Sequence, residues 1–279
     1  MKIFTTKHEV SQHLQQLQAA GKSVGFIPTM GALHQGHISL LAQAKQQTHI
    51  VVCSIFVNPT QFNDPKDLEK YPRPIEADVA KLEQAGCDVL FNPAVNEMYA
   101  GNESWHLDIG ELEHLLEGKF RPGHYQGVMQ VVNKLFSIIH PNLAFFGQKD
   151  YQQVMVIGQM VNKLNLPVKL VMCPIERETD GLAMSSRNIH LTADDRQHSL
   201  VLYRALNNAK ADFEAGKPLD EVARQAAALI DRENGTALEY FELADGQTLY
   251  PATQNSPSIV ALVAARVGRT RLIDNVIIR

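Results

Sequence analysis

The segment of residues 24–57 constrains the fold more than any other part of the chain. Two apolar runs, at residues 24–27 and 49–57, flank a stretch that begins near Gly36 and has the apolar spacing of a helix. The second run is almost continuously apolar, as expected for a strand covered on both faces. Strand, helix and strand at this distance predict a βαβ unit. Because Pro28 has no N–H to give to a sheet ladder, we expect it to end the first strand.

The same alternation of strand and helix continues along the chain. Further strands are predicted at residues 2–5, 89–91, 143–146 and 168–173, and helices at residues 75–85, 128–139 and 151–164. This order is typical of an α/β fold with a doubly wound, Rossmann-like parallel sheet. After residue 174 two predicted helices, at residues 193–215 and 219–231, precede predicted strands at residues 238–243, 259–265 and 271–278. We therefore expect a Rossmann-like domain at residues 1–175 and a smaller C-terminal α+β domain at residues 176–279.

Charge, hydropathy and cysteine content exclude several classes of protein. A net charge of -4 gives no general attraction to nucleic acid or to an anionic membrane surface. The sequence has no apolar run long enough to span a bilayer and no signal segment at its start, so we expect a cytoplasmic protein. Its three cysteines, Cys53, Cys87 and Cys173, form no C-x-x-C pair. They predict buried, inert thiols rather than a disulfide framework or a zinc site.

The turn after the first strand has the features of an anion site. Gly31 and Gly36 leave the backbone open to close approach, and the N–H groups at the start of the next helix point past the end of the strand. His34 and His37 are three residues apart and so face the same way. Imidazole donors suit phosphate oxygens that gain charge during a reaction, which favours a triphosphate site. From spacing alone, two surface histidines or half of a metal site are the alternatives.

Polar residues also follow two other predicted strands. Asn58 and Gln61 come after the strand at residues 49–57. The strand at residues 143–146 is followed by Gly147, Gln148, Lys149, Asp150 and Gln153. Because the carboxyl ends of strands in a doubly wound sheet lie at one edge, we expect these groups to converge on the same crevice as the two histidines. Taken singly, the lysine and the glutamines fit surface positions, and Asp150 fits a helix N-cap.

A third polar group stands near the predicted domain boundary. It comprises Met184, Ser185, Ser186 and Arg187, whose two hydroxyls and permanent cation suit a triphosphate, although a plain loop cap is the alternative. The sequence lacks the common nucleotide signatures. No G-x-G-x-x-G follows the first strand, and the G-K-S at residues 21–23 lacks the earlier glycine of a P-loop and precedes a strand. A nucleotide site must therefore be of another type.

These motifs together resemble those of a known family. Residues 28–37, P-T-M-G-A-L-H-Q-G-H, resemble the HxGH box of adenylate-forming enzymes and nucleotidylyl transferases, and residues 184–187 resemble their second, KMSKS-type box. The whole set resembles the pantoate–β-alanine ligases, in the family's order and over nearly the whole chain. It also includes residues 56–62, 71–73, 121–124, 146–153, 180–188 and 266–275.

The resemblance implies a two-step reaction with ATP as a substrate. The carboxylate of pantoate attacks the α-phosphate of ATP and gives pantoyl adenylate and pyrophosphate. The amine of β-alanine then displaces AMP and gives pantothenate. The resemblance further implies Mg²⁺ together with the ATP, a C-terminal domain that acts as a lid, and a homodimer.

The resemblance also implies roles for residues in ATP chemistry. By position, His37 is the implied proton donor, and His34 shares the phosphate contact. Lys149 and Arg187 are implied to stabilise charge as pyrophosphate leaves. The implied ATP contacts are Met30, Gly31, Ala32, Leu33, His34, Gln35, Gly36, His37, Gly147, Gln148, Lys149, Asp150, Glu176, Met184, Ser185, Ser186 and Arg187.

The main implied contacts with the other substrates are two glutamines. Gln61 and Gln153 are implied to bind pantoate, and Gln61 is also implied to lie near β-alanine. Asn58 and Arg121 are further candidates for the same site. Because an amide carries no charge, the glutamines can orient pantoate without adding repulsion to its carboxylate.

The sequence departs from the family pattern at three positions. Glu176 stands where relatives often have an apolar residue. This difference matters little if ATP contacts the main chain of residue 176 rather than its side chain. Gln148 replaces a common glutamate. Relatives often carry adjacent acids that are thought to assist magnesium, and here the pair is Ala77 and Asp78, so Asp78 is the candidate metal ligand.

Two other functions fit part of this pattern. A nucleotidylyl transferase would need cations for a phosphate-bearing acceptor around Gln61 and Gln153, and the nearby sequence has none. A catalytically silent nucleotide sensor is disfavoured because both histidines, Lys149 and Arg187 are present.

Overall fold

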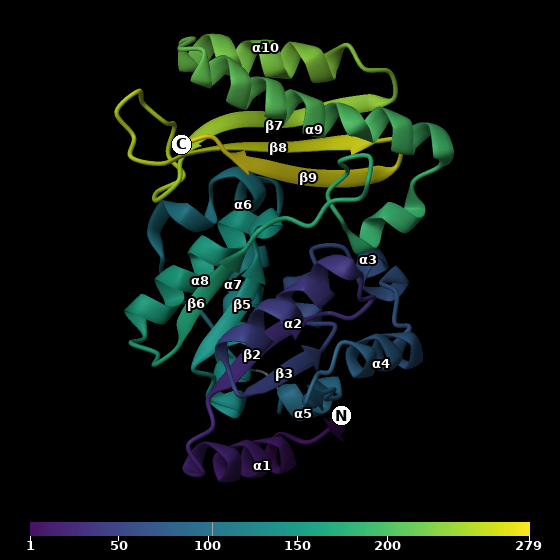
Figure 1. The fold of residues 1–279 in the computed structure, drawn as a ribbon, viewed down its shortest axis with the longest axis vertical. Coiled ribbons are helices and arrows are strands. Elements are labelled where there is room, and N and C mark those ends of the chain that lie inside the picture. The colour runs from purple at the N-terminus through teal and green to yellow at the C-terminus, as the bar shows by residue number, and fades with distance from the viewer. Residues whose placement is uncertain (102) are drawn as a thin grey trace. The chain divides into compact units, whose positions relative to one another are not determined.

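The computed structural model of the protein describes residues 1–101 and 103–279 (Figure 1). The chain folds into two compact units. Unit 1 comprises Met1–Gly147 and Gln152–Pro174, and unit 2 comprises Gln148–Tyr151 and Ile175–Arg279. The segment Gln148–Tyr151 thus groups with the C-terminal residues, although it lies inside the range predicted for the N-terminal domain. None of the described helices combines the length and the apolar character needed to cross a membrane.

Unit 1 contains the predicted doubly wound parallel sheet. Among the described residues, six strands pair in parallel in the order β1-β4-β3-β2-β5-β6. They are β1 (Lys2–Phe4), β2 (Val24–Thr29), β3 (Ile50–Ile55), β4 (Val89–Phe91), β5 (Leu143–Gly147) and β6 (Lys169–Cys173). From β2 the chain proceeds to β3 and β4 on one side and then returns to β5 and β6 on the other. Open α/β sheets bind ligands at such a switch point, beyond the carboxyl ends of the strands.

Helices cover both faces of this sheet. On one face, Leu41 of α2 and Leu82 of α4 pack in a buried cluster with Ile27 of β2. On the other face, Phe26 of β2 meets Phe136 of α7 edge to face, since successive strand residues point in opposite directions. The helices that lie in unit 1 or begin at its boundary are α1 (Lys7–Ala19), α2 (Gln35–Gln47), α3 (Pro65–Lys70), α4 (Ile75–Gln84), α5 (Val95–Met98), α6 (Leu116–Phe120), α7 (His124–Ile139) and α8 (Tyr151–Lys163).

Pro28 does not end β2, and that prediction is wrong. The strand continues to Thr29 and stays in register with β3 to its end. Thr29 O accepts a hydrogen bond from Phe56 N at 3.0 Å on the β3 side, so the backbone of the adjacent Pro28 faces β5. Registered pairing with β5 stops at Phe26. The missing N–H of Pro28 therefore falls beyond the paired part of β5.

The three cysteines are buried free thiols, as predicted. Burial raises the pKa of Cys87 and of Cys173 to about 11, and it raises the pKa of Cys53 well above its ordinary value. Because the thiolate is the reactive form, these cysteines are inert near neutral pH.

Unit 2 contains the predicted α+β fold. Its antiparallel sheet has the order β7 (Thr236–Asp245), β8 (Ile259–Val267) and β9 (Thr270–Ile277). The helices α9 (Ala193–Glu214) and α10 (Leu219–Asp231) lie on one face of this sheet and bury an apolar cluster against it (Figure 1). Two short 3-10 helices, η3 (Gln148–Asp150) and η4 (Ser186–His190), belong to the same unit.

Candidate active site

The loop between β2 and α2, with the start of α2, carries all the predicted ATP contacts of unit 1 except Gly147, and α4 fixes its conformation. Gly31 and Ala32 have φ values of 82° and 51°, a region that glycine adopts freely and alanine rarely. Asp78 Oδ2 accepts a hydrogen bond from Ala32 N at 2.7 Å, and Asp78 Oδ1 accepts one from Leu33 N at 2.8 Å. Lys81 Nζ donates to Leu33 O at 2.6 Å. Two side chains of one helix therefore hold this turn.

His34 and His37 form the N-terminal cap of α2, and each accepts a main-chain N–H at Nδ1. His34 Nδ1 accepts from Gly36 N, and His37 Nδ1 accepts from His34 N, both at 3.2 Å. The two ring centroids are 4.1 Å apart. A neutral imidazole that accepts at Nδ1 carries its proton on Nε2. Both rings lie at a helix N-terminus, where an anion is favoured.

Gln61 lies in the 3-10 helix η1 (Pro59–Gln61) that follows β3, and a hydrogen-bond chain orients its amide. Tyr99 OH donates to Asn58 Oδ1 at 2.7 Å, and Asn58 Nδ2 donates to Gln61 Oε1 at 3.1 Å. Gln61 Nε2 in turn reaches Met30 Sδ at 3.2 Å. Because its oxygen is engaged by Asn58, Gln61 presents its N–H groups toward the β2–α2 loop. No sequence signal pointed to Tyr99, which lies 41 residues from Asn58 in a segment without clear periodicity.

The start of α7 supports the same 3-10 helix. The His124 ring hydrogen-bonds Gln61 O through Nδ1 at 2.8 Å. At Gly127 an added Cβ would lie 2.3 Å from Thr60 O, so only glycine allows this approach. Asn58 Nδ2 also donates to Gly127 O at 3.1 Å. His124, the last residue of the R-P-G-H motif at residues 121–124, therefore helps to hold Gln61 in place.

The two neighbouring glutamines of α8 have different surroundings. Gln152 is buried, and its amide is used within unit 1: Oε1 accepts from Glu117 N at 3.0 Å, and Nε2 donates to Leu112 O and Leu115 O at 2.8 Å each. Gln153, the predicted pantoate contact, lies in the first turn of α8 and is half-buried. Its assignment stays a prediction.

In unit 2, residues 176–184 form a tight hairpin that carries part of the predicted ATP site. Met184 N donates to Glu176 O at 3.0 Å, and Arg177 bridges to Ala183 in antiparallel fashion. Ser185 then caps η4, because its Oγ accepts from Arg187 N at 3.2 Å. The Arg187 side chain is exposed, as a flexible phosphate contact requires. The Glu176 side chain is also exposed, and its assignment to the ATP site stays a prediction.

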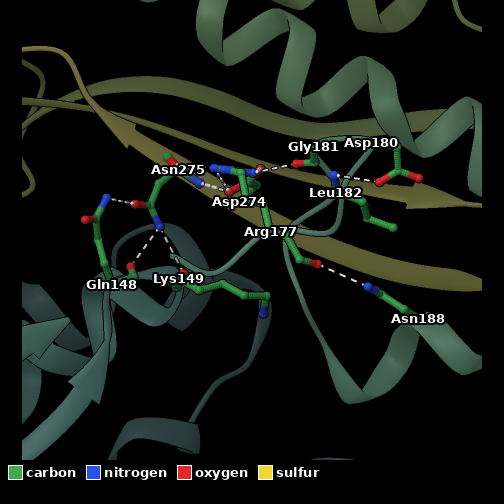
Figure 2. A network of polar contacts seen from close by, with 10 residues as sticks. Gln148, Lys149, Arg177, Asp180, Gly181, Leu182, Asn188, Asp274 and Asn275 are labelled. Carbon is green, nitrogen blue, oxygen red and sulfur yellow. Dashed lines mark hydrogen bonds and ion pairs between the residues drawn. The ribbon is translucent and has the colours of Figure 1, made fainter. Parts of the chain in front are cut away.

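Lys149 lies in η3 and is half-buried. Asn275 of β9 holds its main chain by a hydrogen bond to Lys149 O, and the same side-chain amide forms hydrogen bonds with Gln148 (Figure 2). The segment follows β5 directly in the chain, yet it belongs to unit 2. Asn275 ends the motif at residues 266–275 for which the sequence suggested no role.

The surroundings of Asp78 leave little room for a magnesium ion. Its side chain is 1% exposed, and both carboxylate oxygens accept main-chain N–H groups. Protein-bound Mg²⁺ usually keeps several waters, which need space at the ligand. In the described part of the chain, no cluster of three or more His, Cys, Asp or Glu side chains could hold a metal ion. The contacts favour a structural role for Asp78, and the predicted metal contact stays a prediction.

The sheet order explains which predicted groups unit 1 brings together. β3, β2 and β5 are neighbours, so the loops after β3 and β2 emerge side by side at one edge. The hydrogen bond from Gln61 to Met30 joins these two loops directly. The histidine donors, the start of α2 and the oriented Gln61 amide thus gather at the switch point of the sheet.

Fold and site together define a class of protein. A doubly wound α/β unit that presents two imidazole donors and a helix N-terminus at its switch point is suited to bind a nucleotide and to act on it. The family model described as Pantoate-beta-alanine ligase matches residues 2–277. The chain belongs to the pantoate–β-alanine ligase family, and it is therefore a ligase of the pantothenate-forming kind.

Individual relatives support this membership. A pantothenate synthetase from Dehalococcoides mccartyi is 51% identical over 254 residues, which cover 90% of this chain and 94% of that protein. The crystal structure of a pantothenate synthetase from Thermus thermophilus has a TM-score of 0.95 at 40% identity and covers 100% of this chain and 99% of that one. A Francisella tularensis pantoate-β-alanine ligase, solved with β-γ ATP and β-alanine, has a TM-score of 0.83 at 37% identity, with coverage of 100% and 98%.

Proposed function

We propose that this protein condenses pantoate with β-alanine through a pantoyl adenylate, with the histidine cap of α2 as the phosphate-binding element of unit 1. The observation that carries this proposal is the orientation of His34 and His37. Both rings accept main-chain N–H groups at Nδ1 at the start of α2, so in its neutral form each ring carries its proton on Nε2. Family membership supplies the reaction, and this geometry supports an HxGH role for the two residues.

In the first step a carboxylate oxygen of pantoate attacks the α-phosphorus of ATP. The bond between that phosphorus and the oxygen bridging to the β-phosphate breaks, and pyrophosphate leaves with the electron pair. Charge therefore grows on the phosphate oxygens, where preorganised donors act most strongly. We assign His37 as the donor to these oxygens, with His34 beside it, and Gly31, Ala32, Leu33, Gln35 and Gly36 as the loop that approaches the nucleotide.

The oriented amide of Gln61 suits pantoate. Its N–H groups face the β2–α2 loop, so they can donate to the carboxylate or hydroxyl oxygens of pantoate without adding negative charge. Gln153 is assigned as the second amide contact, and Gln61 as a contact of β-alanine. In the second step the β-alanine amine attacks the acyl carbon, AMP leaves with the electron pair of the broken C–O bond, and the amine loses a proton.

Unit 2 supplies cations and hydroxyls for the same nucleotide in this proposal. Lys149 and Arg187 neutralise the departing pyrophosphate, and Ser185 and Ser186 donate to phosphate oxygens. The main chain around Gln148, Asp150, Glu176 and Met184 of unit 2, together with Gly147 of unit 1, completes the assigned ATP contacts. Mg²⁺ enters as a component of the substrate, bound to the phosphates of ATP. We further propose a homodimer, which sedimentation of the purified protein tests, and a cytoplasmic location, which fractionation of cells tests.

A two-stage assay tests the reaction. The protein is incubated with ATP, pantoate and Mg²⁺, pyrophosphate is measured, and β-alanine is then added. We expect pyrophosphate in the first stage, and AMP with the amide product in the second. A nucleotidylyl transferase would instead leave AMP attached to an acceptor, and that outcome would contradict the proposal.

A histidine variant tests the assigned donor. His37→Ala should lower the rate of pyrophosphate formation about 100-fold or more, as the loss of one preorganised donor does elsewhere. His8→Ala, which removes an exposed histidine of α1, is the matched control and should keep the wild-type rate. Because His37 also caps α2, thermal unfolding of both variants must be measured. A folded His37→Ala protein with nearly wild-type turnover would end the assignment.

A further inference from the structure

Asn275 of β9 makes hydrogen bonds to Gln148 and to the predicted phosphate contact Lys149 (Figure 2). Its Nδ2 donates to Gln148 O at 2.9 Å and to Lys149 O at 3.0 Å. Its Oδ1 accepts from Gln148 Nε2 at 3.1 Å. Asn275 is only 1% exposed, so these bonds form away from bulk water. One amide thus fixes the main chain of η3 at two successive carbonyls.

The residue before Asn275 holds the second predicted phosphate-binding segment. Asp274 accepts two hydrogen bonds from the Arg177 guanidinium, at 2.7 and 2.9 Å, and Arg177 is the second residue of the hairpin at residues 176–184. Arg177 also donates to Gly181 O across this hairpin at 3.0 Å and lies over the Tyr203 ring at 4.2 Å. Burial raises the pKa of the Asp274 carboxyl, while the bidentate Arg177 pair opposes that rise.

Adjacent residues of one strand therefore anchor two segments that lie far apart in sequence. Asn275 holds residues 148–149, and Asp274 holds the hairpin that leads into Ser185 and Arg187 (Figure 2). Tyr151 OH adds a bond to Gly246 O at 2.8 Å. These contacts explain why Gln148–Tyr151 belongs to unit 2 although both flanking segments of the chain belong to unit 1.

We propose that Asn275 is a positioning residue for Lys149. We propose also that Asp274, the neighbouring residue of β9, positions the Ser185–Arg187 segment through its ion pair with Arg177. The inference rests on the proposed function, in which these segments bind the phosphates of ATP. A lysine has a long, flexible side chain, so the place of its ammonium group depends on a main chain that does not move. Fixing Lys149 O to β9 supplies that rigidity, and it keeps the two cationic segments in constant relation to each other.

A purely structural role for Asn275 predicts a different outcome from a positioning role. A structural role would lower activity to the same degree whether or not Lys149 is present. A positioning role acts through Lys149, so its effect should disappear with that side chain. A double-mutant cycle separates the two cases.

The cycle compares Asn275→Ala, Lys149→Ala and the double variant in pyrophosphate formation. We expect Asn275→Ala to slow the wild-type protein about tenfold or more, and the Lys149→Ala protein about twofold or less. The KM for pantoate should stay near the wild-type value, because the assigned pantoate contact Gln61 lies in unit 1. Thr270→Val, which alters another buried polar residue of β9, is the matched control and should leave the rate unchanged.

Amide hydrogen exchange gives a readout that does not depend on activity. Asn275→Ala should speed exchange in the peptide that covers Gln148–Tyr151, and Thr270→Val should not. If Asn275→Ala does not fold, Asn275→Leu provides a similar shape without the donors and takes its place. Equal fold-losses in both Lys149 backgrounds, a wild-type rate for Lys149→Ala, or unchanged exchange would each overturn the inference. An inactive wild-type protein would instead refute the proposed function, while exchange would still decide whether Asn275 holds the segment.

Discussion

Replacing Asp78 by Asn tests whether this residue holds the β2–α2 loop or binds magnesium. The substitution keeps the size of the side chain but exchanges one carboxylate oxygen for an NH₂ group. One of the two loop donors, Ala32 N or Leu33 N, then faces another donor instead of an acceptor. Because the site is 1% exposed, water cannot replace the lost bond without a rearrangement.

The expected loss of stability follows from these two bonds. A hydrogen bond to a charged group contributes about 1.5–3 kcal/mol, and the exchange abolishes one such bond and removes the charge from the other. We therefore expect Asp78→Asn to lower the free energy of unfolding of unit 1 by about 3 kcal/mol. For a unit of this size that corresponds to a fall in Tm of roughly 6–12 °C. Ala32, at φ 51°, would lose the contact that keeps it in a rarely adopted conformation.

The assay is thermal unfolding in buffer with EDTA and without ATP. The matched control is Glu76→Gln, which removes the same charge from an exposed position in the first turn of the same helix. If Asp78 were a metal ligand, its loss would leave the metal-free protein as stable as wild type and would raise the Mg²⁺ concentration needed for half-maximal activity. An unchanged Tm with a shifted Mg²⁺ requirement would therefore refute the loop-holding role.

Two further predictions concern the orienting chain and the hairpin. Tyr99→Phe removes the O–H that donates to Asn58, so it should raise the KM for pantoate about fivefold, equivalent to about 1 kcal/mol, and leave the KM for ATP unchanged; equal KM values for pantoate would contradict this role. A hydrogen bond from Arg196 lowers the pKa of Glu178. The pair therefore stabilises the protein fully at pH values above the ordinary pKa of a glutamate. This contribution is lost as the pH falls through the lowered pKa of Glu178. The difference in Tm between wild type and Arg196→Gln should thus narrow from pH 7 to pH 3, and a constant difference would count against it.

Strands and helices were predictable because their signals are local. The runs at residues 89–91 and 219–231 match β4 (Val89–Phe91) and α10 (Leu219–Asp231) in both bounds, since apolar periodicity and β-branched content are read within one element. Pro28 was misjudged because a sequence does not show which neighbouring strand a residue's N–H faces. That direction depends on the register of β2 with β3 and β5, which forms only in the assembled sheet.

The predicted site residues were recognisable because phosphate-binding groups cluster in short motifs, such as the one at residues 34–37. Their supports were not recognisable in the same way. Tyr99 reaches Asn58 across 41 residues, and Asn275 reaches Gln148 across 127 residues. The residues around a tyrosine or an asparagine do not indicate such a partner. The role of the side chain depends on which distant main-chain or amide group it hydrogen-bonds in the folded protein.

The residues proposed for ATP chemistry are divided between two units, and the division has a chemical consequence. The imidazole donors His34 and His37 depend on α2 and α4 of unit 1, whereas Lys149 and Arg187 depend on β9 and the hairpin of unit 2. A substitution that loosens one set leaves the supports of the other intact. Asp78→Asn and Asn275→Ala should therefore lower pyrophosphate formation by independent factors, and the loss in the double variant should equal the product of the single losses. A much smaller combined loss would mean that both substitutions act on one shared element, and the assignment of separate supports would then be wrong.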